Sequence, residues 1–186
     1  MNRNRIVSLC LLVLVAVLGL GLLREVTSRD SAQAPVRNVI LVRHAEKAAE
    51  PQEDPGLTAV GVERAEALSR ALAGMNVGHV ITSQYERTIA TASAVIRDSG
   101  ASREEIPAGL GEEALRSVAD AVAARPDGET VLIVGHSNTV PSIVAALGGT
   151  RYPDLEDHEY DSIFLLQIDS HGAVRTMRLR FGEPAG

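Results

Sequence analysis

The feature that most constrains the fold is a pair of short apolar runs that each stop at a histidine. Residues 39–42 lead directly into Arg43-His44, and residues 131–134 lead into Gly135-His136. Apolar, β-branched runs of this length that end at polar or turn-forming residues are typical of buried β-strands. Both predicted strands therefore deliver a histidine at their carboxyl ends, although the two histidines are far apart in the chain.

Strand patterns alternate with helix patterns along the rest of the sequence. The pattern predicts strands over residues 36–42, 77–82 and 130–134, helices over 58–73, 84–98, 112–124 and 139–147, and a closing hairpin from 162–168 and 174–181. This alternation predicts an α/β domain with a mainly parallel sheet. Ligands of such sheets bind beyond the carboxyl ends of the strands, so His44 and His136 are expected to meet there.

Two polar segments are predicted to lie outside regular structure. Residues 101–111 are expected to form a loop between two helices, and the acidic run 154–161 (DLEDHEYD) is expected to form a solvated loop. Ser83, which follows a predicted strand and precedes a predicted helix, is expected to cap that helix.

The N-terminal segment is apolar enough to direct export. Residues 6–23 contain 18 consecutive uncharged residues after Arg3 and Arg5. Such a segment is a signal peptide, here with a small-residue cleavage pattern ending near Ala34, or an uncleaved membrane anchor. Both alternatives predict an extracytoplasmic domain, either anchored by the N-terminal helix or secreted. Residues 1–34 are thus expected to form a targeting segment and linker, and residues 35–186 one domain of ordinary size.

The composition limits the partners of this domain. The net charge of -6 argues against nucleic acid as a partner, because binding nucleic acid requires a basic surface that neutralises phosphates. Lys47 is the only lysine, so nearly all positive charge is guanidinium, which binds phosphate or carboxylate in a fork. Cys10, the only cysteine, lies in the apolar segment, which excludes a disulfide or a cysteine-ligated metal within the predicted domain.

The residues at the strand ends suggest phosphate chemistry. Arg87 follows a third strand end, so two arginines and two histidines are expected to converge. Their N–H donors and positive charge complement a phosphate dianion. A neutral imidazole can attack phosphorus and carry the phosphoryl group, while guanidinium groups stabilise the transition state. This chemistry requires neither a metal ion nor another cofactor.

These motifs resemble the histidine phosphatase superfamily, which is phosphoglycerate-mutase-like, in its small branch-1-type members. The matching elements are Arg43-His44-Ala45, where the family usually has Arg-His-Gly, then Leu57-Thr58 with Gly61, then Ser83 with Arg87 and Thr91-Ala92, and finally Gly135-His136. The resemblance spans about residues 39–149 and implies a three-layer sandwich with a mainly parallel central sheet, to which the C-terminal hairpin is added. It implies that His44 is the phosphorylated nucleophile and that Arg43, Arg87 and His136 form the phosphate pocket. Ser137 and Asn138 follow His136 and are further candidates for substrate binding.

The general acid of the family has no clear counterpart in this sequence. Many members carry a glutamate after the second helix that protonates the leaving oxygen, and residues 101–111 lack that acidic signature. The candidates are Glu46, Asp54 and Glu112, with Glu104 and Glu105 also near in sequence. With an acid, the expected function is an exported or membrane-anchored phosphomonoesterase that acts on small phosphorylated compounds. Without one, the alternatives are a phosphatase restricted to activated phosphates such as phosphohistidine, or a non-catalytic module that binds phosphate ligands.

Overall fold

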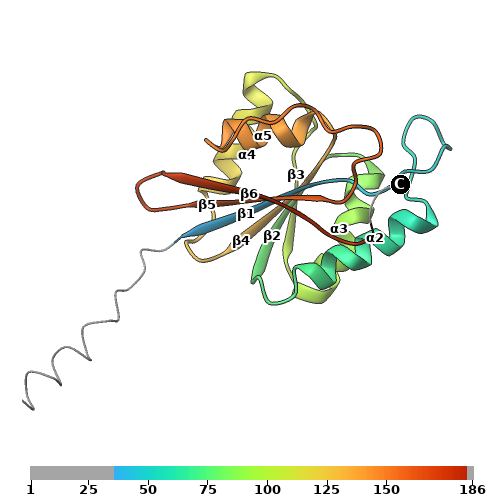
Figure 1. Cartoon of the computed structure of the whole chain (residues 1–186), viewed down its shortest axis with the longest axis horizontal. Coiled ribbons are helices and arrows are strands. Elements are labelled where there is room, and N and C mark those ends of the chain that lie inside the picture. The colour runs from blue at the N-terminus through green and yellow to red at the C-terminus, as the bar shows by residue number, and fades with distance from the viewer. Residues whose placement is uncertain (1–35, 184–186) are drawn as a thin grey trace, which may run out of the picture. The chain divides into compact units, whose positions relative to one another are not determined.

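The computed structural model describes residues 36–183, which form a mixed sheet with helices on both faces (Figure 1). The order of the six strands is β3-β2-β4-β1-β5-β6. β1 (Arg37–Arg43), β2 (Val77–Thr82), β3 (Ser102–Glu105) and β4 (Thr130–Gly135) run parallel, while β5 (Ser162–Ile168) and β6 (Val174–Arg180) form the antiparallel hairpin. The predicted mainly parallel sheet and C-terminal hairpin are confirmed.

Each face of the sheet is covered by a pair of helices. Alternate residues of β1 point to opposite faces, because side chains along a strand alternate with a period of two. Val39 and Leu41 pack in the core beneath α4 (Glu112–Ala123) and α5 (Thr139–Ala146). Ile40 and Val42 pack in the core beneath α2 (Ala59–Ala71) and α3 (Glu86–Ser99). Burial on both faces explains why the strand sequence is continuously apolar, and it gives the predicted three layers.

The prediction of a loop over residues 101–111 is wrong in its first part, which forms β3. This strand has the sequence Ser-Arg-Glu-Glu and pairs only with β2 at one edge of the sheet. Its side chains are largely exposed, so it has no apolar alternation that sequence reasoning could use. Charged residues are typical of edge strands, where they oppose pairing with another chain.

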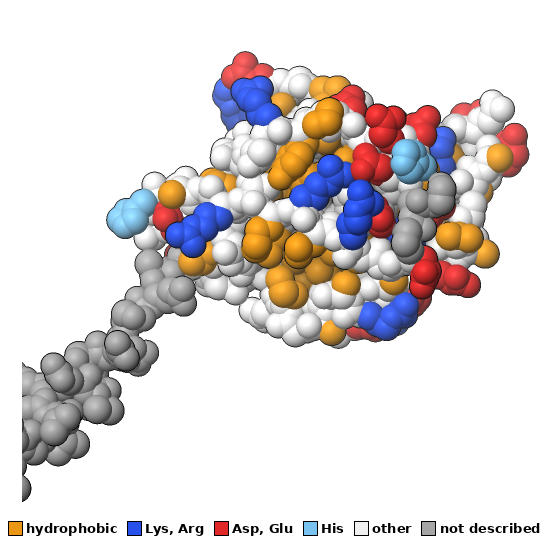
Figure 2. All heavy atoms as spheres, viewed as in Figure 1, with side chains coloured by type: hydrophobic (Ala, Val, Ile, Leu, Met, Phe, Trp, Pro, Cys, Tyr) orange, Lys and Arg blue, Asp and Glu red, His pale blue; other side chains and the backbone are white. Residues whose placement is uncertain are grey.

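The other edge of the sheet is formed by β6, whose surface mixes arginine with apolar side chains. Met177 and Leu179 are about half exposed, and Figure 2 shows hydrophobic side chains beside basic side chains on this face of the molecule. Among residues 36–183, no helix has the length and hydropathy needed to cross a bilayer. The apolar segment 6–23 and the cleavage pattern near Ala34 lie outside the described residues, so export stays a prediction.

Candidate active site

The predicted phosphate-binding residues line one open cavity of about 420 Å³ at the carboxyl ends of β1 and β4. The structure brings together the six residues that the sequence nominated for this role: Arg43, His44, Arg87, His136, Ser137 and Asn138. The remaining lining residues are Lys47, Tyr85, Ala108, Gly109, Leu110, Thr139 and Asp157. Three arginine or lysine side chains and two imidazoles thus face one carboxylate in this cavity.

His44 is held with one ring nitrogen protonated and the other free. Its backbone N–H donates to the Gly135 carbonyl at 2.9 Å, which extends the pairing of β1 with β4 by one residue. Its Nδ1 lies 2.8 Å from the carbonyl oxygen of Ala45. Because a carbonyl oxygen can only accept, Nδ1 carries the proton, and Nε2 keeps its lone pair. The side chain is almost fully buried, and burial lowers the pKa of His44 to about 3, helped by the positive charges of Arg43 and Arg87.

Helix α3 fixes the backbone directly after His44. The Ala45 N–H donates to Thr91 Oγ1 at 2.9 Å, and the same hydroxyl donates to the Arg87 carbonyl at 2.7 Å. Arg87 and Thr91 lie four residues apart and therefore on one face of the helix. Thr91 thereby couples the position of the His44 backbone to the helix that carries Arg87.

Helix α2 supports the same segment from the other side. The Thr58 N–H donates to the Glu46 carbonyl at 2.9 Å, and Thr58 Oγ1 caps the helix by accepting from the Gly61 N–H at 3.0 Å. A Cβ atom at position 61 would collide with the Glu46 carbonyl, so only glycine allows this approach. The Leu-Thr-x-x-Gly motif therefore stabilises the loop after His44 through its contacts with the Glu46 backbone.

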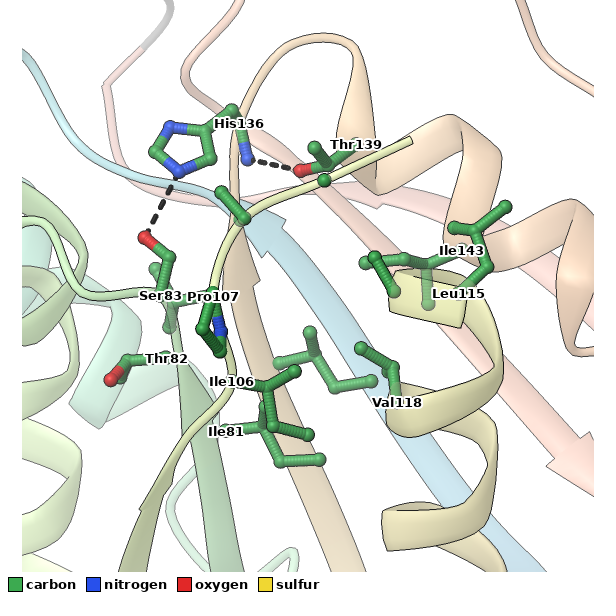
Figure 3. Close-up of a pocket in the computed structure, with 16 residues that line it drawn as sticks. Ile81, Thr82, Ser83, Ile106, Pro107, Leu115, Val118, His136, Thr139 and Ile143 are labelled. Atoms are coloured by element: carbon green, nitrogen blue, oxygen red, sulfur yellow. Dashed lines mark hydrogen bonds between the residues drawn. The ribbon is translucent and has the colours of Figure 1, made fainter. Parts of the chain in front are cut away.

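His136 faces His44 across the cavity, with their ring centroids 5.3 Å apart. Its Nε2 lies 3.0 Å from Ser83 Oγ, as Figure 3 shows, and that hydroxyl lies 3.0 Å from Thr88 Oγ1. Burial lowers the pKa of His136 to about 4, with Arg87 and Arg43 adding to the effect. The prediction that Ser83 caps the helix is wrong, because α3 has Tyr85 at its N-cap and Ser83 holds His136 instead.

Each cavity arginine keeps one N–H donor without a partner among the described residues. The Arg43 guanidinium lies 4.1 Å from the centroid of the Tyr160 ring, and the Arg87 guanidinium lies 4.2 Å from that of Tyr85. The Nε atoms of both arginines are buried and make no hydrogen bond within residues 36–183. A buried, unpaired donor is costly, so an anion that reached these two N–H groups would be stabilised by them.

The acidic run 154–161 is a partly exposed loop, as predicted, and it also forms one wall of the site, where Asp157 lines the cavity. Arg43 Nη1 donates to the carbonyl oxygens of Glu156, Asp157 and Glu159 at 2.8, 3.1 and 3.3 Å. Leu155 is buried, and Tyr160 covers the Arg43 guanidinium. Sequence reasoning missed Tyr85, Tyr160 and Asp157, although the position of Tyr85 two residues before Arg87 is a signal that could have found it.

The three carboxylates nominated as the general acid do not line the cavity. Glu46 accepts hydrogen bonds from Arg64 Nε and Nη2 at 2.7 to 3.0 Å. Asp54 accepts from the Glu86 N–H at 3.0 Å and lies 3.7 Å from Arg87 Nη1. Glu112 pairs with Arg116 on the exposed surface of α4. Each of these carboxylates is engaged in a structural contact.

The part of the chain from residue 36 to residue 183 contains no cluster of three or more His, Cys, Asp or Glu side chains that could ligate a metal ion.

Both cavity imidazoles are expected to stay neutral well below the usual pKa of histidine. A titration of the ring resonances by NMR should show two histidines that do not charge between pH 8 and pH 5, and His44→Ala and His136→Ala variants assign them. In the unfolded chain both histidines take up a proton near the ordinary histidine pKa of 6.5. The folded state should therefore lose stability as the pH falls from about 6.5 toward 4. Titration of both rings near pH 6.5 would contradict the burial of the site.

The sequence and the fold were compared with known proteins. The family model described as "Histidine phosphatase superfamily (branch 1)" matches residues 39–115, which include Arg43, His44 and Arg87. A comparison with curated proteins found no match.

Several solved structures share the fold. A proposed phosphohistidine phosphatase SixA from Nakamurella multipartitia has a TM-score of 0.58 and 23% identity, covering 82% of this chain and 99% of the other. The protein histidine phosphatase SixA complexed with tungstate has a TM-score of 0.62 and 20% identity, covering 77% and 96%. A mycobacterial glucosyl-3-phosphoglycerate phosphatase in complex with VO3 has a TM-score of 0.60 and 17% identity, covering 81% and 100%. These likenesses establish the phosphoglycerate-mutase-like fold, and the family match shows that residues 39–115 are similar to the histidine phosphatase superfamily, branch 1.

Proposed function

We propose that this protein is a metal-independent phosphohydrolase that acts on small phosphorylated compounds through a covalent intermediate on His44. The observation that carries this proposal is the state of His44: a buried, neutral imidazole whose Nδ1–H is fixed by the Ala45 carbonyl, which leaves Nε2 as a free nucleophile. Arg43 and Arg87 line the same cavity, and their guanidinium groups are the proposed donors for phosphate oxygens.

The reaction follows from these positions in two steps. In the first, the Nε2 lone pair attacks phosphorus, and the bond from phosphorus to the leaving oxygen breaks with its electron pair going to that oxygen. In the second, water attacks the phosphorus of phospho-His44 and returns the electron pair of the P–N bond to Nε2. The guanidinium groups stabilise the negative charge of the three equatorial oxygens in both transition states.

His136 fits the role of a further phosphate donor. A neutral imidazole has one N–H, and a phosphate dianion only accepts hydrogen bonds. Ser83 Oγ is within 3.0 Å of Nε2, so a Ser83 hydroxyl that donates to Nε2 places the N–H of His136 on Nδ1. Nδ1 is then the atom that donates to a bound phosphate.

The substrate range depends on how the leaving oxygen is protonated. The carboxylates of Glu46, Asp54 and Glu112 lie outside the cavity lining, and Asp157 is the one carboxylate of the described residues within it. Without an acid from this residue, the reaction would be limited to activated phosphates such as phosphohistidine, whose leaving groups depart without full protonation. Two of these structural neighbours bear the name of the phosphohistidine phosphatase SixA, one of them in complex with tungstate, and a third is named a glucosyl-3-phosphoglycerate phosphatase and was solved with VO3. These names support a phosphorylated small molecule or side chain as the substrate.

The decisive experiment is to trap phospho-His44. The protein is mixed with 32P-labelled acetyl phosphate in EDTA and quenched in alkali, where a phosphoramidate survives, and the label should be lost from a His44→Ala variant. Phosphorylation of the variant, or turnover that EDTA abolishes, would contradict the proposal. Saturable binding of phosphate esters without label or turnover would instead indicate a non-catalytic binding module.

We also propose that the domain works outside the cytoplasm, which the uncharged run 6–23 after Arg3 and Arg5 supports. Cells that produce the full chain should hold the protein in the membrane fraction if the segment is an anchor, or release it after cleavage near Ala34 if it is a signal. Recovery of the uncleaved chain in the soluble cytoplasmic fraction would contradict this location.

A further inference from the structure

We propose that Asp157 is the general acid that protonates the leaving oxygen, a role that rests on the proposed phosphatase function. Asp157 provides the one carboxylate among the described residues that line the cavity with His44. The segment that carries it lies between α5 and β5, far in sequence from the three acids that the motifs nominate.

The backbone around Asp157 is fixed by contacts from both sides. Its own carbonyl accepts from Arg43 Nη1 at 3.1 Å, next to the bonds that the same nitrogen makes to Glu156 and Glu159. Arg43 is 6% exposed, so this anchor is well shielded from water. Arg43, the proposed phosphate ligand, thus also holds the segment that carries Asp157, and both residues line the same cavity.

A second set of contacts anchors the same segment to the rest of the fold. The Leu155 N–H donates to the carbonyl of Ser137, a cavity residue, at 3.0 Å. Glu159 accepts from the Glu156 N–H at 3.0 Å through one carboxylate oxygen and from Arg178 Nη2 of β6 at 2.7 Å through the other. The turn that carries Asp157 is therefore held by hydrogen bonds on both sides, and the position of its backbone does not depend on the closure of a mobile segment.

The Asp157 carboxylate is also free to exchange a proton. Its side chain is exposed at the cavity rim, and it makes no hydrogen bond or ion pair with a residue between 36 and 183. The competing carboxylates of Glu46 and Asp54 instead accept hydrogen bonds from Arg64 and from the Glu86 N–H at the start of α3. A bound phosphate dianion adds negative charge beside Asp157, and a nearby like charge favours the protonated form of a carboxylic acid.

The proton then balances through both steps of the reaction. As His44 Nε2 bonds to phosphorus, the Asp157 carboxyl gives its proton to the leaving oxygen, which departs as an alcohol. In the second step the Asp157 carboxylate takes a proton from the attacking water, so the cycle ends with inorganic phosphate and a protonated Asp157. Such assistance matters for alkyl phosphates, whose alkoxide leaves poorly, and matters little for acetyl phosphate.

The test compares leaving groups in an Asp157→Asn variant of the full chain. Asparagine keeps the backbone carbonyl that Arg43 uses and removes only the acid. We expect kcat for glycerol 2-phosphate to fall by about a hundredfold or more, while kcat for acetyl phosphate stays within about threefold of the wild type. The wild-type kcat for glycerol 2-phosphate should fall at high pH, where the acid loses its proton. The Asp157→Asn variant should not show this fall in its pH profile.

Two further variants separate chemistry from structure. Asp157→Glu should recover part of the glycerol 2-phosphate rate, and Asp154→Asn, an exposed acid of the same segment outside the cavity lining, should leave both rates unchanged. Equal losses on both substrates, or an unchanged rate on glycerol 2-phosphate, would overturn the role of Asp157 while leaving phospho-His44 intact. A wild-type protein that turns over acetyl phosphate alone would also overturn it, and one that turns over neither substrate would overturn the proposed function itself.

Discussion

Replacement of His44 by alanine is expected to lower kcat for p-nitrophenyl phosphate hydrolysis by a factor on the order of 10⁴ or more, as removal of a nucleophile does in other covalent enzymes. The physical reason is that Nε2 of His44 is the free lone pair of a neutral ring, whereas His136 Nε2 is engaged with Ser83. Initial rates in EDTA, at saturating substrate, measure the effect directly.

The fold of the His44→Ala variant should survive, which makes the result interpretable. The backbone N–H of residue 44 still bonds to Gly135, and that of Ala45 still bonds to Thr91, so the strand end keeps its anchors. His171→Ala serves as the matched control, because His171 is exposed in the β5–β6 turn. A His44→Ala protein that melts like the wild type and also retains its turnover would rule out His44 as the nucleophile.

The strand-end histidines could be predicted because two independent signals agree at those positions. A buried parallel strand is continuously apolar, so its end is visible in the sequence, and the carboxyl edge of such a sheet is where ligands bind. His44 and His136 follow strands that pair in register, Arg43 opposite Gly135, which explains how residues so distant in sequence come to share a cavity.

The acidic wall of the site could not be predicted, since its contacts do not depend on side-chain type. Arg43 binds the segment 154–161 through backbone carbonyls, which every sequence offers. Composition therefore indicated only solvation. Strand β3 was not predicted for a related reason. It pairs with β2 through backbone groups, and its side chains are polar.

The partners of Ser83 and Glu46 could not be predicted from the sequence, because both partners come from distant segments. The first N–H of α3 is satisfied by Asp54, 32 positions earlier, which releases the Ser83 hydroxyl for His136. Glu46 lies next to His44 in sequence but pairs with Arg64 of α2, whose side chain is 6% exposed. Proximity in sequence predicted neither partner, because both partners are set by packing of the helices against the loop after β1.

Replacement of Arg43 by lysine is expected to lower both turnover and stability, a combination that distinguishes it from the other cavity arginine. Lysine keeps the positive charge but has a single side-chain nitrogen. It therefore cannot donate to phosphate, as the Nε–H of arginine could, and also bind the carbonyls of the segment 154–161. We expect kcat/KM for p-nitrophenyl phosphate to fall by about 10²- to 10³-fold, as for removal of one donor to a developing oxyanion.

The stability effect should be specific to Arg43. Its Nη1 donates to three carbonyls of the segment 154–161, whereas the Arg87 guanidinium lies near the half-exposed Asp54 carboxylate and the Tyr85 ring. Loss of those bonds at roughly 1 kcal/mol each predicts about 2 to 3 kcal/mol. For a domain of this size that corresponds to a fall in Tm on the order of 5 to 10 °C.

Arg87→Lys is the matched variant, and we expect it to lose a comparable factor in kcat/KM. Its Tm should stay within about 2 °C of the wild type, because the Arg87 guanidinium holds no backbone segment. Kinetics and thermal melting of the two variants side by side therefore separate phosphate binding from support of the wall. If Arg43→Lys melted like Arg87→Lys, the segment 154–161 would be held by Glu159 and Leu155 alone, and Arg43 would act only on phosphate. If instead Arg43→Lys lost stability but kept its kcat/KM, the arginine would be a structural anchor, and the phosphate oxygens would be bound by Arg87 and His136 without it.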